Sequence, residues 1–86
     1  MEATEGTIRV RLFARYAELL GRDTLTLTVT LPTTVADVVA QLRRTLPAAQ
    51  ALPERPLTAV NLRHVFPESP LSDGDELALL PPLAGG

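Results

Sequence analysis

The chain has 86 residues, of which 45% are hydrophobic and 21% are charged, and its formal net charge is −2. This composition is typical of a folded protein. A chain of this length forms one domain with a modest core, which is too small for a deep substrate cavity together with a catalytic apparatus. All eight basic residues are arginines scattered along the chain. They form no concentrated basic stripe, so we expect no nucleic-acid partner. Because there is no lysine, no side-chain amine of the chain can be acylated.

The residues that usually build reactive centres are scarce. The chain contains no cysteine, which excludes disulfides, thiolate metal sites and a cysteine nucleophile. His64 is the only histidine, so we expect no metal centre, no Ser-His-Asp arrangement and no bound cofactor. No apolar run approaches the ~20 residues of a membrane span, and the N-terminus does not resemble a secretion signal. We therefore expect a cytoplasmic protein with no membrane partner.

The first half of the chain predicts two strands and a helix. Residues 1–6 are polar and are predicted to be a frayed tail, and the domain is predicted to span residues 7–80. Alternating apolar residues predict a first strand from Thr7 and a second from Thr24 to Leu31, paired as an antiparallel hairpin. Between them, residues 14–21 suit one or two helical turns ended by Gly21.

A longer helix and three further strands complete the pattern. Thr34 and Asp37 are spaced as in a helix-capping box, and apolar residues then recur at helical spacing as far as Leu46. Residues 47–56 read as a loop, 57–62 and 64–66 as strands, and 76–80 as the last strand after an Asp-Gly-Asp turn. The order predicts an α+β fold in which one main helix packs on a small mixed sheet, with the first and last strands parallel in its middle. This is the ubiquitin-like β-grasp.

The end of the chain carries the most unusual segment. After the last strand come Pro81, Pro82, Leu83, Ala84, Gly85 and Gly86. The two prolines favour an extended backbone, and six residues would project about 20 Å from the sheet. Two terminal glycines would pass through a channel too narrow for a Cβ atom and present a carboxylate at its far end. The segment 81–86 therefore predicts an arm that delivers its terminus to another protein's active site.

One face of the sheet is predicted to dock that partner. Strand alternation places Phe13, Ala78 and Leu80 on the face opposite the main helix, beside Arg9 and Arg11. The alternative is that the short helix after Phe13, or the proline-rich loop, covers them. The carboxylates of the Asp-Gly-Asp turn are interpreted as turn chemistry and not as a site.

Three segments resemble the small subunits of molybdopterin synthase, which are ubiquitin-like sulfur carriers. They are LFARYAELLG (residues 12–21), AVN (residues 59–61) and PLSDGDELALLPPLAGG (residues 70–86), and the resemblance covers about residues 7–86. The last segment is the most specific. Two departures from the family pattern are Phe66, where relatives often have a polar or small residue, and extra proline in the loop before residue 57.

The resemblance implies a function without a catalytic centre in this chain. An activating enzyme related to ubiquitin activators would use ATP to adenylate the carboxylate of Gly86, and a sulfur donor protein would convert it to a thiocarboxylate. The tail would enter the large synthase subunit, where sulfur passes to cyclic pyranopterin monophosphate to form molybdopterin. Gly85 would be the slim neighbour of the reactive end. The residues implied to bind the partner are Phe13, Leu80, Pro81, Pro82, Leu83 and Ala84.

Two other functions remain open from the sequence. A related carrier would supply sulfur for cysteine, thiamine or tRNA thiolation; thiazole carriers are usually shorter and lack the opening seen at residues 12–21. A ubiquitin-like modifier would be joined through Gly86 to amines of other proteins, since this chain offers no lysine acceptor.

Overall fold

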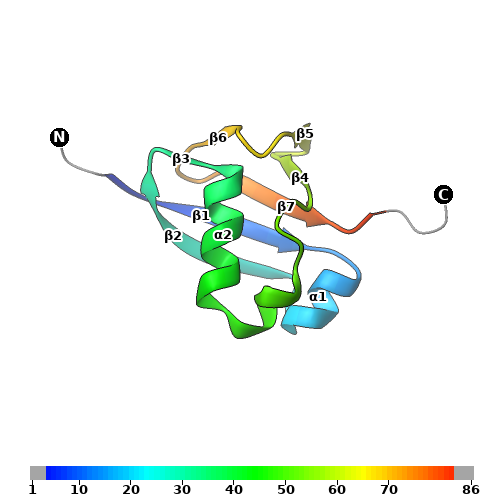
Figure 1. The fold of residues 1–86 in the computed structure, drawn as a ribbon. Coiled ribbons are helices and arrows are strands. Elements are labelled where there is room, and N and C mark those ends of the chain that lie inside the picture. The colour runs from blue at the N-terminus through cyan, green and yellow to red at the C-terminus, as the bar shows by residue number, and fades with distance from the viewer. Residues whose placement is uncertain (1–3, 83–86) are drawn as a thin grey trace.

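A five-stranded mixed sheet with a helix packed across one face forms the body of the molecule, which the computed structural model describes over residues 4–82 (Figure 1). The strand order in the sheet is β2-β1-β7-β4-β5, and a separate two-stranded sheet pairs β3 with β6. In chain order the elements are β1 (Thr4–Leu12), α1 (Arg15–Leu20), β2 (Thr24–Leu31), β3 (Thr33–Thr34), α2 (Val35–Thr45), the 3₁₀ helix η1 (Pro47–Ala51), β4 (Leu57–Val60), β5 (Arg63–Val65), β6 (Pro70–Leu71) and β7 (Glu76–Leu80).

The first and last strands lie side by side in the centre of the sheet. β1 and β7 run parallel, with Arg9 paired to Glu76 and Leu12 to Leu79, while the neighbours β2 and β4 are antiparallel to them. A parallel pair needs a crossover connection, and the segment containing α2 supplies it. The predicted β-grasp arrangement and its central parallel pair are confirmed.

Local signals in the sequence fix both α-helices. The Thr34 hydroxyl accepts a hydrogen bond of 3.2 Å from the backbone N–H of Asp37, which caps the first turn of α2 as predicted. α1 ends at Leu20 and is capped by Gly21, whose φ of 72° lets the N–H of the next residue, Arg22, donate to the carbonyl of Ala17 at 3.1 Å. Both boundaries are set by residues whose conformation or side chain satisfies backbone groups that the helix leaves unpaired.

The hydrophobic core lies between the sheet and α2. Apolar side chains at alternate strand positions meet those at helical spacing, and fifteen of the residues that the structure describes form this cluster. Ile8, Val10, Leu77 and Leu79, from the two central strands, are at most 1% exposed. Because successive side chains of a strand point to opposite faces, the side chains between these buried residues face solvent or a partner.

The predicted N-terminal tail over residues 1–6 is wrong for residues 4–6. β1 begins at Thr4 and pairs with β2 as far as Leu31. Gly6 is buried, and a Cβ atom built there would lie 2.7 Å from Leu31 Cδ1. Polar composition suggested a frayed end, but the second strand is long enough to pair with these residues. Residues 1–3 lie outside the described part of the chain.

Other boundaries also differ from the prediction. The loop predicted for residues 47–56 contains η1, and the strands predicted for 57–62 and 64–66 are β4 and β5, which end at Val60 and Val65. β4 stops because Asn61 and Leu62 form the hairpin turn with positive φ angles of 49° and 74°. The two-residue strands β3 and β6 are too short to produce an alternating pattern, so the sequence gives no indication of them.

Within residues 4–82 no helix has the length and apolarity needed to cross a membrane. The same part of the chain contains no cluster of His, Cys, Asp or Glu that could hold a metal ion.

Candidate functional site: the root of the C-terminal tail

Three neighbouring strands bring apolar side chains together where the C-terminal tail leaves the sheet. Leu80 ends β7 and is paired with Leu57 on β4, while the pairing of Leu12 with Leu79 sets Phe13, the next residue, beside Leu80. All three side chains lie on the face opposite α2, because the residues that alternate with them are buried in the core.

These side chains line an open hollow of about 530 Å³, here called the tail-root hollow. Phe13 is 37% exposed and Leu57 is 52% exposed, so neither the short helix nor the proline-rich loop covers the hollow. The predicted exposed face is therefore present, with Phe13 and Leu80 on it. The full lining is Phe13, Ala14, Leu57, His64, Leu80, Pro81 and Pro82.

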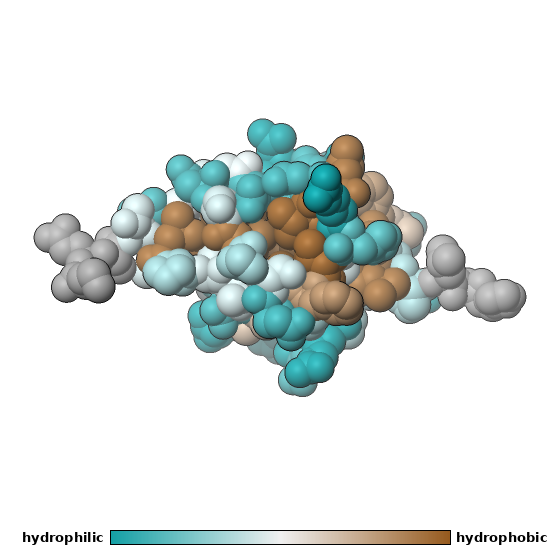
Figure 2. Space-filling model, turned by 90° about the horizontal axis from the view of Figure 1, so that it is seen from above, coloured by the Kyte–Doolittle hydropathy of each residue, from teal (hydrophilic) through white to brown (hydrophobic). Residues whose placement is uncertain are grey.

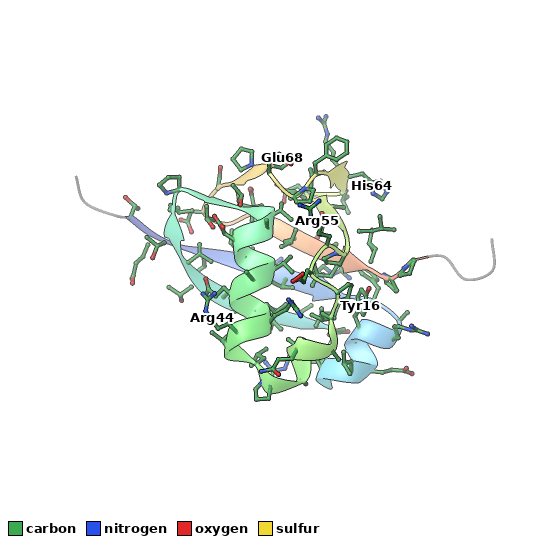
Figure 3. The ribbon with its side chains drawn as sticks, viewed as in Figure 1. Tyr16, Arg44, Arg55, His64 and Glu68 are labelled. Atoms are coloured by element: carbon green, nitrogen blue, oxygen red, sulfur yellow. The ribbon has the colours of Figure 1, made fainter. Side chains whose placement is uncertain are left out.

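The link between Phe13 and α1 has an unusual backbone. Ala14 has φ 52° and ψ −125°, a conformation that L-residues with a Cβ atom rarely adopt. The conformation turns the chain away from β1, and the N–H of Tyr16 then donates to the carbonyl of Phe13 at 3.0 Å. This turn sends α1 towards the core side, where Tyr16 is buried (Figure 3), and leaves Phe13 on the open face.

Charged side chains border the hollow on the same face. Arg9 and Arg11 both approach Glu76, at 3.8 and 3.9 Å, and the guanidinium of Arg11 lies 5.3 Å from the centre of the Phe13 ring. The side chains of Arg9 and Arg11 are 67% and 43% exposed, so these ion pairs contribute little to stability. Two arginines against one glutamate leave this border positive although the chain as a whole carries −2.

A second hollow lies on the helix side of the tail. It has a volume of about 440 Å³ and is lined by Arg15, Tyr16, Leu19, Ala51, Pro53 and Pro82. Pro82 lines both hollows and therefore lies between them. Pro81 is half-buried and Pro82 is exposed.

The structure places some of the predicted site residues and leaves others undescribed. It brings Phe13, Leu80, Pro81 and Pro82 together at one hollow. The predicted residues Leu83, Ala84, Gly85 and Gly86 lie outside the described residues, and their roles stay predictions.

Sequence reasoning missed three members of the tail-root hollow: Ala14, Leu57 and His64. The pairing of Leu57 with Leu80, and of His64 with Ala59 in the next strand, brings two of them to this face. Residues 57–60 show no clear alternation, so only the pairing of the strands shows that Leu57 and His64 lie on this face. Ala14 gave no signal, since alanine is not a residue that usually marks a positive φ.

Comparison with known proteins identifies the family. The model of the ThiS family matches residues 10–86. The chain is 39% identical over 85 residues to the molybdopterin synthase sulfur carrier subunit of Escherichia coli, covering 92% of this chain and 99% of that protein. It is 33% identical over 81 residues to the protein of the same name from Chlamydomonas reinhardtii, covering 92% and 98%.

Solved structures share the fold along nearly the whole chain. Small archaeal modifier protein 1 of Haloferax volcanii aligns with a TM-score of 0.82 and 30% identity, covering 94% of this chain and all of that one. A chain in the complex of subunits 1 and 2 of the molybdopterin-converting factor from Helicobacter pylori aligns with a TM-score of 0.67 and 22% identity, covering 93% and 99%. With a family match over residues 10–86 and relatives matched over nearly their full length, this chain belongs to the ThiS family.

Proposed function

We propose that the chain is the sulfur-carrier subunit of a molybdopterin synthase and that the carboxylate of Gly86 carries the sulfur. The observation that carries this proposal is the open apolar hollow at the root of a Pro-Pro tail, in a chain 39% identical to a subunit of that name. The chain is a carrier and not an enzyme on its own: its role is to present a terminus to partner enzymes. We propose the cytoplasm as the compartment where this occurs.

The proposed chemistry takes place in the partners. A carboxylate is a poor acylating group, so an ATP-dependent activating enzyme joins it to AMP and releases pyrophosphate. Sulfide (HS⁻) supplied by a donor protein then attacks the acyl carbon, the C–S bond forms as the bond to AMP breaks, and the terminus is a thiocarboxylate. The tail finally enters the large synthase subunit, where the sulfur passes to cyclic pyranopterin monophosphate. ATP is consumed by the activating enzyme and is not bound by this chain.

The geometry supports a tail that works independently of the domain. Pro81 and Pro82 continue directly from β7, and each fixes its φ angle and lacks a backbone N–H. The four residues after Pro82 span about 13 Å when extended. A partner that receives the terminus must therefore come close to the tail root, where the apolar hollow is available to bind it.

The first test concerns the terminus. After incubation with ATP, the activating enzyme and a sulfur donor, intact-mass analysis should find one oxygen replaced by sulfur at Gly86. Deletion of Gly86 should abolish ATP–pyrophosphate exchange and leave the melting temperature unchanged, since the core cluster lies entirely within residues 8–79. Normal exchange by the truncated chain would contradict the proposal.

The second test separates docking from stability. Leu80→Asp should weaken binding to the large subunit by more than about 2 kcal/mol, because it places a charge in the tail-root hollow. It should cost the free domain less than Leu79→Ala, which removes a fully buried side chain and is expected to lower the free energy of unfolding by about 2–5 kcal/mol. Calorimetric titration and thermal melting give the two quantities. Unchanged binding by Leu80→Asp would show that the partner docks elsewhere.

A modifier function is the second candidate, because small archaeal modifier protein 1 shares the fold at 30% identity. It predicts isopeptide adducts on other proteins in place of sulfur at Gly86, and the same mass analysis distinguishes the two. A carrier for cysteine, thiamine or tRNA thiolation would gain the sulfur but would not support molybdopterin formation with the large subunit.

A further inference from the structure

Three of the five large hydrophobic side chains that stand exposed in residues 4–82 lie on one hairpin, β4–β5, and its flanks. Leu57 is 52% exposed, Leu62 is 88% exposed and Phe66 is 74% exposed. Leu62 lies in the hairpin turn, whereas Leu57 and Phe66 lie at the open end, beside each other, because Thr58 pairs with Val65. Leu57 is exposed because it lines the tail-root hollow, whereas Phe66 does not line that hollow and its exposure needs another explanation.

Phe66 extends the apolar face of the tail root across the sheet. Phe13, Leu80, Leu57 and Phe66 follow one another from β1 through β7 and β4 to the end of β5. Next to the tail-root hollow lies another of about 390 Å³, here called the hairpin hollow, and the two share Leu57 and His64. Its lining is Arg55, Pro56, Leu57, Thr58, His64, Val65, Phe66 and Pro67. In the view from above, brown apolar surface lies among polar surface and extends towards the C-terminal end of β7 (Figure 2).

The backbone that carries Phe66 is held in place by hydrogen bonds. The N–H of Phe66 donates to the Ser69 hydroxyl at 3.3 Å, and the N–H of Ser69 donates to the Phe66 carbonyl at 3.0 Å. The first turn of α2 fixes the same turn, since Val35 and Ala36 donate to the carbonyl groups of Ser69 and Pro67. An exposed aromatic ring on a fixed backbone loses little conformational freedom when it binds, which favours affinity.

Charge at the hairpin hollow indicates the chemistry of its ligand. Arg55 lines the hollow beside His64 (Figure 3), and the ion pairs found within residues 4–82 do not include it. A partner would therefore meet an apolar floor with a guanidinium at its border. The complementary surface is an apolar side chain next to a carboxylate.

We propose that the hairpin hollow is a second docking site for the large subunit that receives the tail, and that Phe66 and Leu57 help to select that subunit. This inference rests on the proposed function. The two hollows share Leu57 and His64, and because four residues after Pro82 can span at most about 13 Å, a partner that receives the terminus must lie close to the adjoining surface. The large subunit places an apolar side chain between Leu57 and Phe66 and a carboxylate at Arg55.

The experiment is calorimetric titration of the full chain with the large subunit from the same organism, after wild-type molybdopterin formation has been measured. Phe66→Ser and Leu57→Ser should each raise Kd at least about tenfold, and Arg55→Glu should also raise it. Leu62→Ser is the matched control: it removes a more exposed leucine from the other end of the same hairpin, and its Kd should stay within about twofold of wild type. Melting curves confirm that each variant folds.

The outcomes separate the two proposals. If the wild-type chain binds the large subunit and supports molybdopterin formation while Phe66→Ser and Leu57→Ser bind as the wild type does, the second docking site is refuted and the carrier function stands. If Leu62→Ser loses as much affinity as Phe66→Ser, the effect is general surface hydrophobicity and the site is likewise refuted. A wild-type chain that does not bind the large subunit overturns both proposals.

Discussion

Ala14 combines an unfavourable backbone with a position at the proposed docking surface. Its φ of 52° and ψ of −125° lie in a region where glycine is the usual residue, and it lines the tail-root hollow. Such conformations cost on the order of 1–3 kcal/mol and persist when the surrounding structure imposes them. Here the end of β1 and the start of α1 impose it from either side.

Glycine at position 14 should relieve this strain. We expect Ala14→Gly to raise the free energy of unfolding by about 1 kcal/mol, because the gain at positive φ exceeds the added flexibility of the unfolded chain. Urea denaturation measures the change. Ala17→Gly is the control: Ala17 lies inside α1, where glycine should destabilise by about 1 kcal/mol. A loss of stability in Ala14→Gly would show that the backbone there is not strained.

Asn61 joins the hairpin turn to β7. Its side-chain N–H donates to Asp75 Oδ1, its side-chain oxygen accepts from the N–H of Glu76, each at 3.0 Å, and its backbone N–H donates to the Glu76 carbonyl at 2.9 Å. Asparagine also tolerates the φ of 49° found there. One residue therefore both forms the turn and fixes its position against the last strand.

Two substitutions separate these roles. Asn61→Ala loses the side-chain bonds and keeps a Cβ atom at positive φ, so the free energy of unfolding should fall by about 1–3 kcal/mol. Asn61→Gly loses the same hydrogen bonds but has no Cβ atom to disfavour the positive φ. Its free energy of unfolding should therefore lie between those of Asn61→Ala and the wild type. Equal losses in the two variants would mean that the backbone conformation contributes nothing. Chemical denaturation of all three proteins gives the comparison.

At the level of the elements, the packing of β1 depends on Gly6, a buried residue whose polar neighbours in the sequence give no sign of its burial. A Cβ atom at position 6 would lie 2.7 Å from Leu31 Cδ1 and 3.2 Å from the Cβ atom of Asp73. Asp73 has little freedom to move away, because its Oδ1 accepts a 2.7 Å hydrogen bond from the N–H of Thr7. The start of β1 is thus packed against both β2 and the Asp-Gly-Asp turn.

We expect Gly6→Ala to lower the free energy of unfolding by about 1–3 kcal/mol, as overpacking of a close contact does. Glu5→Ala at the exposed neighbouring position is the control, and its effect should stay within about 0.5 kcal/mol. Thermal melting of the two variants shows whether residues 4–6 are packed as part of β1 or are a frayed end. If Gly6→Ala melts as the wild type does, these residues contribute little to the fold.

The elements that could be predicted are those with a repeated local signal. The predicted bounds of β2 and β7 agree with the structure, because apolar residues alternate without a break from Thr24 to Leu31 and a short apolar run, residues 77–80, follows the Asp-Gly-Asp turn. β3 and β6, two residues each, have no pattern to read, and the start of β1 is polar on its exposed side. Their pairing is decided by neighbours distant in sequence, which local patterns do not report.

For the molecule as a whole, the sequence predicted the β-grasp and the exposed face with Phe13 and Leu80, but not the extent of that face. Leu57 and His64 join it only through the order of β7, β4 and β5 in the sheet. Phe66, which the resemblance gives as a departure from the family pattern, lines the hairpin hollow. Which residues share a surface depends on strand order, and the sequence predicted only part of that order, β2 beside β1 and β1 beside β7.

The central position of β7 makes the fold depend on the end of the chain. A chain that stops at Asp75 lacks the strand that joins β1 to β4, so we expect it to show no cooperative unfolding transition. A chain that stops at Pro82 keeps every described element and should melt as the full chain does. Calorimetry on both fragments tests this expectation. A cooperative transition in the shorter fragment would mean that β2, β1 and α2 form a stable unit alone.

This strand order also has a consequence during synthesis. The ribosome makes β7 after every other element, yet the sheet cannot close until β7 has entered between its two neighbours. The residues that follow β7 are therefore made only after the last strand of the sheet. A chain that terminates before the end of β7 therefore has neither a closed sheet nor the C-terminal residues on which the proposed function depends.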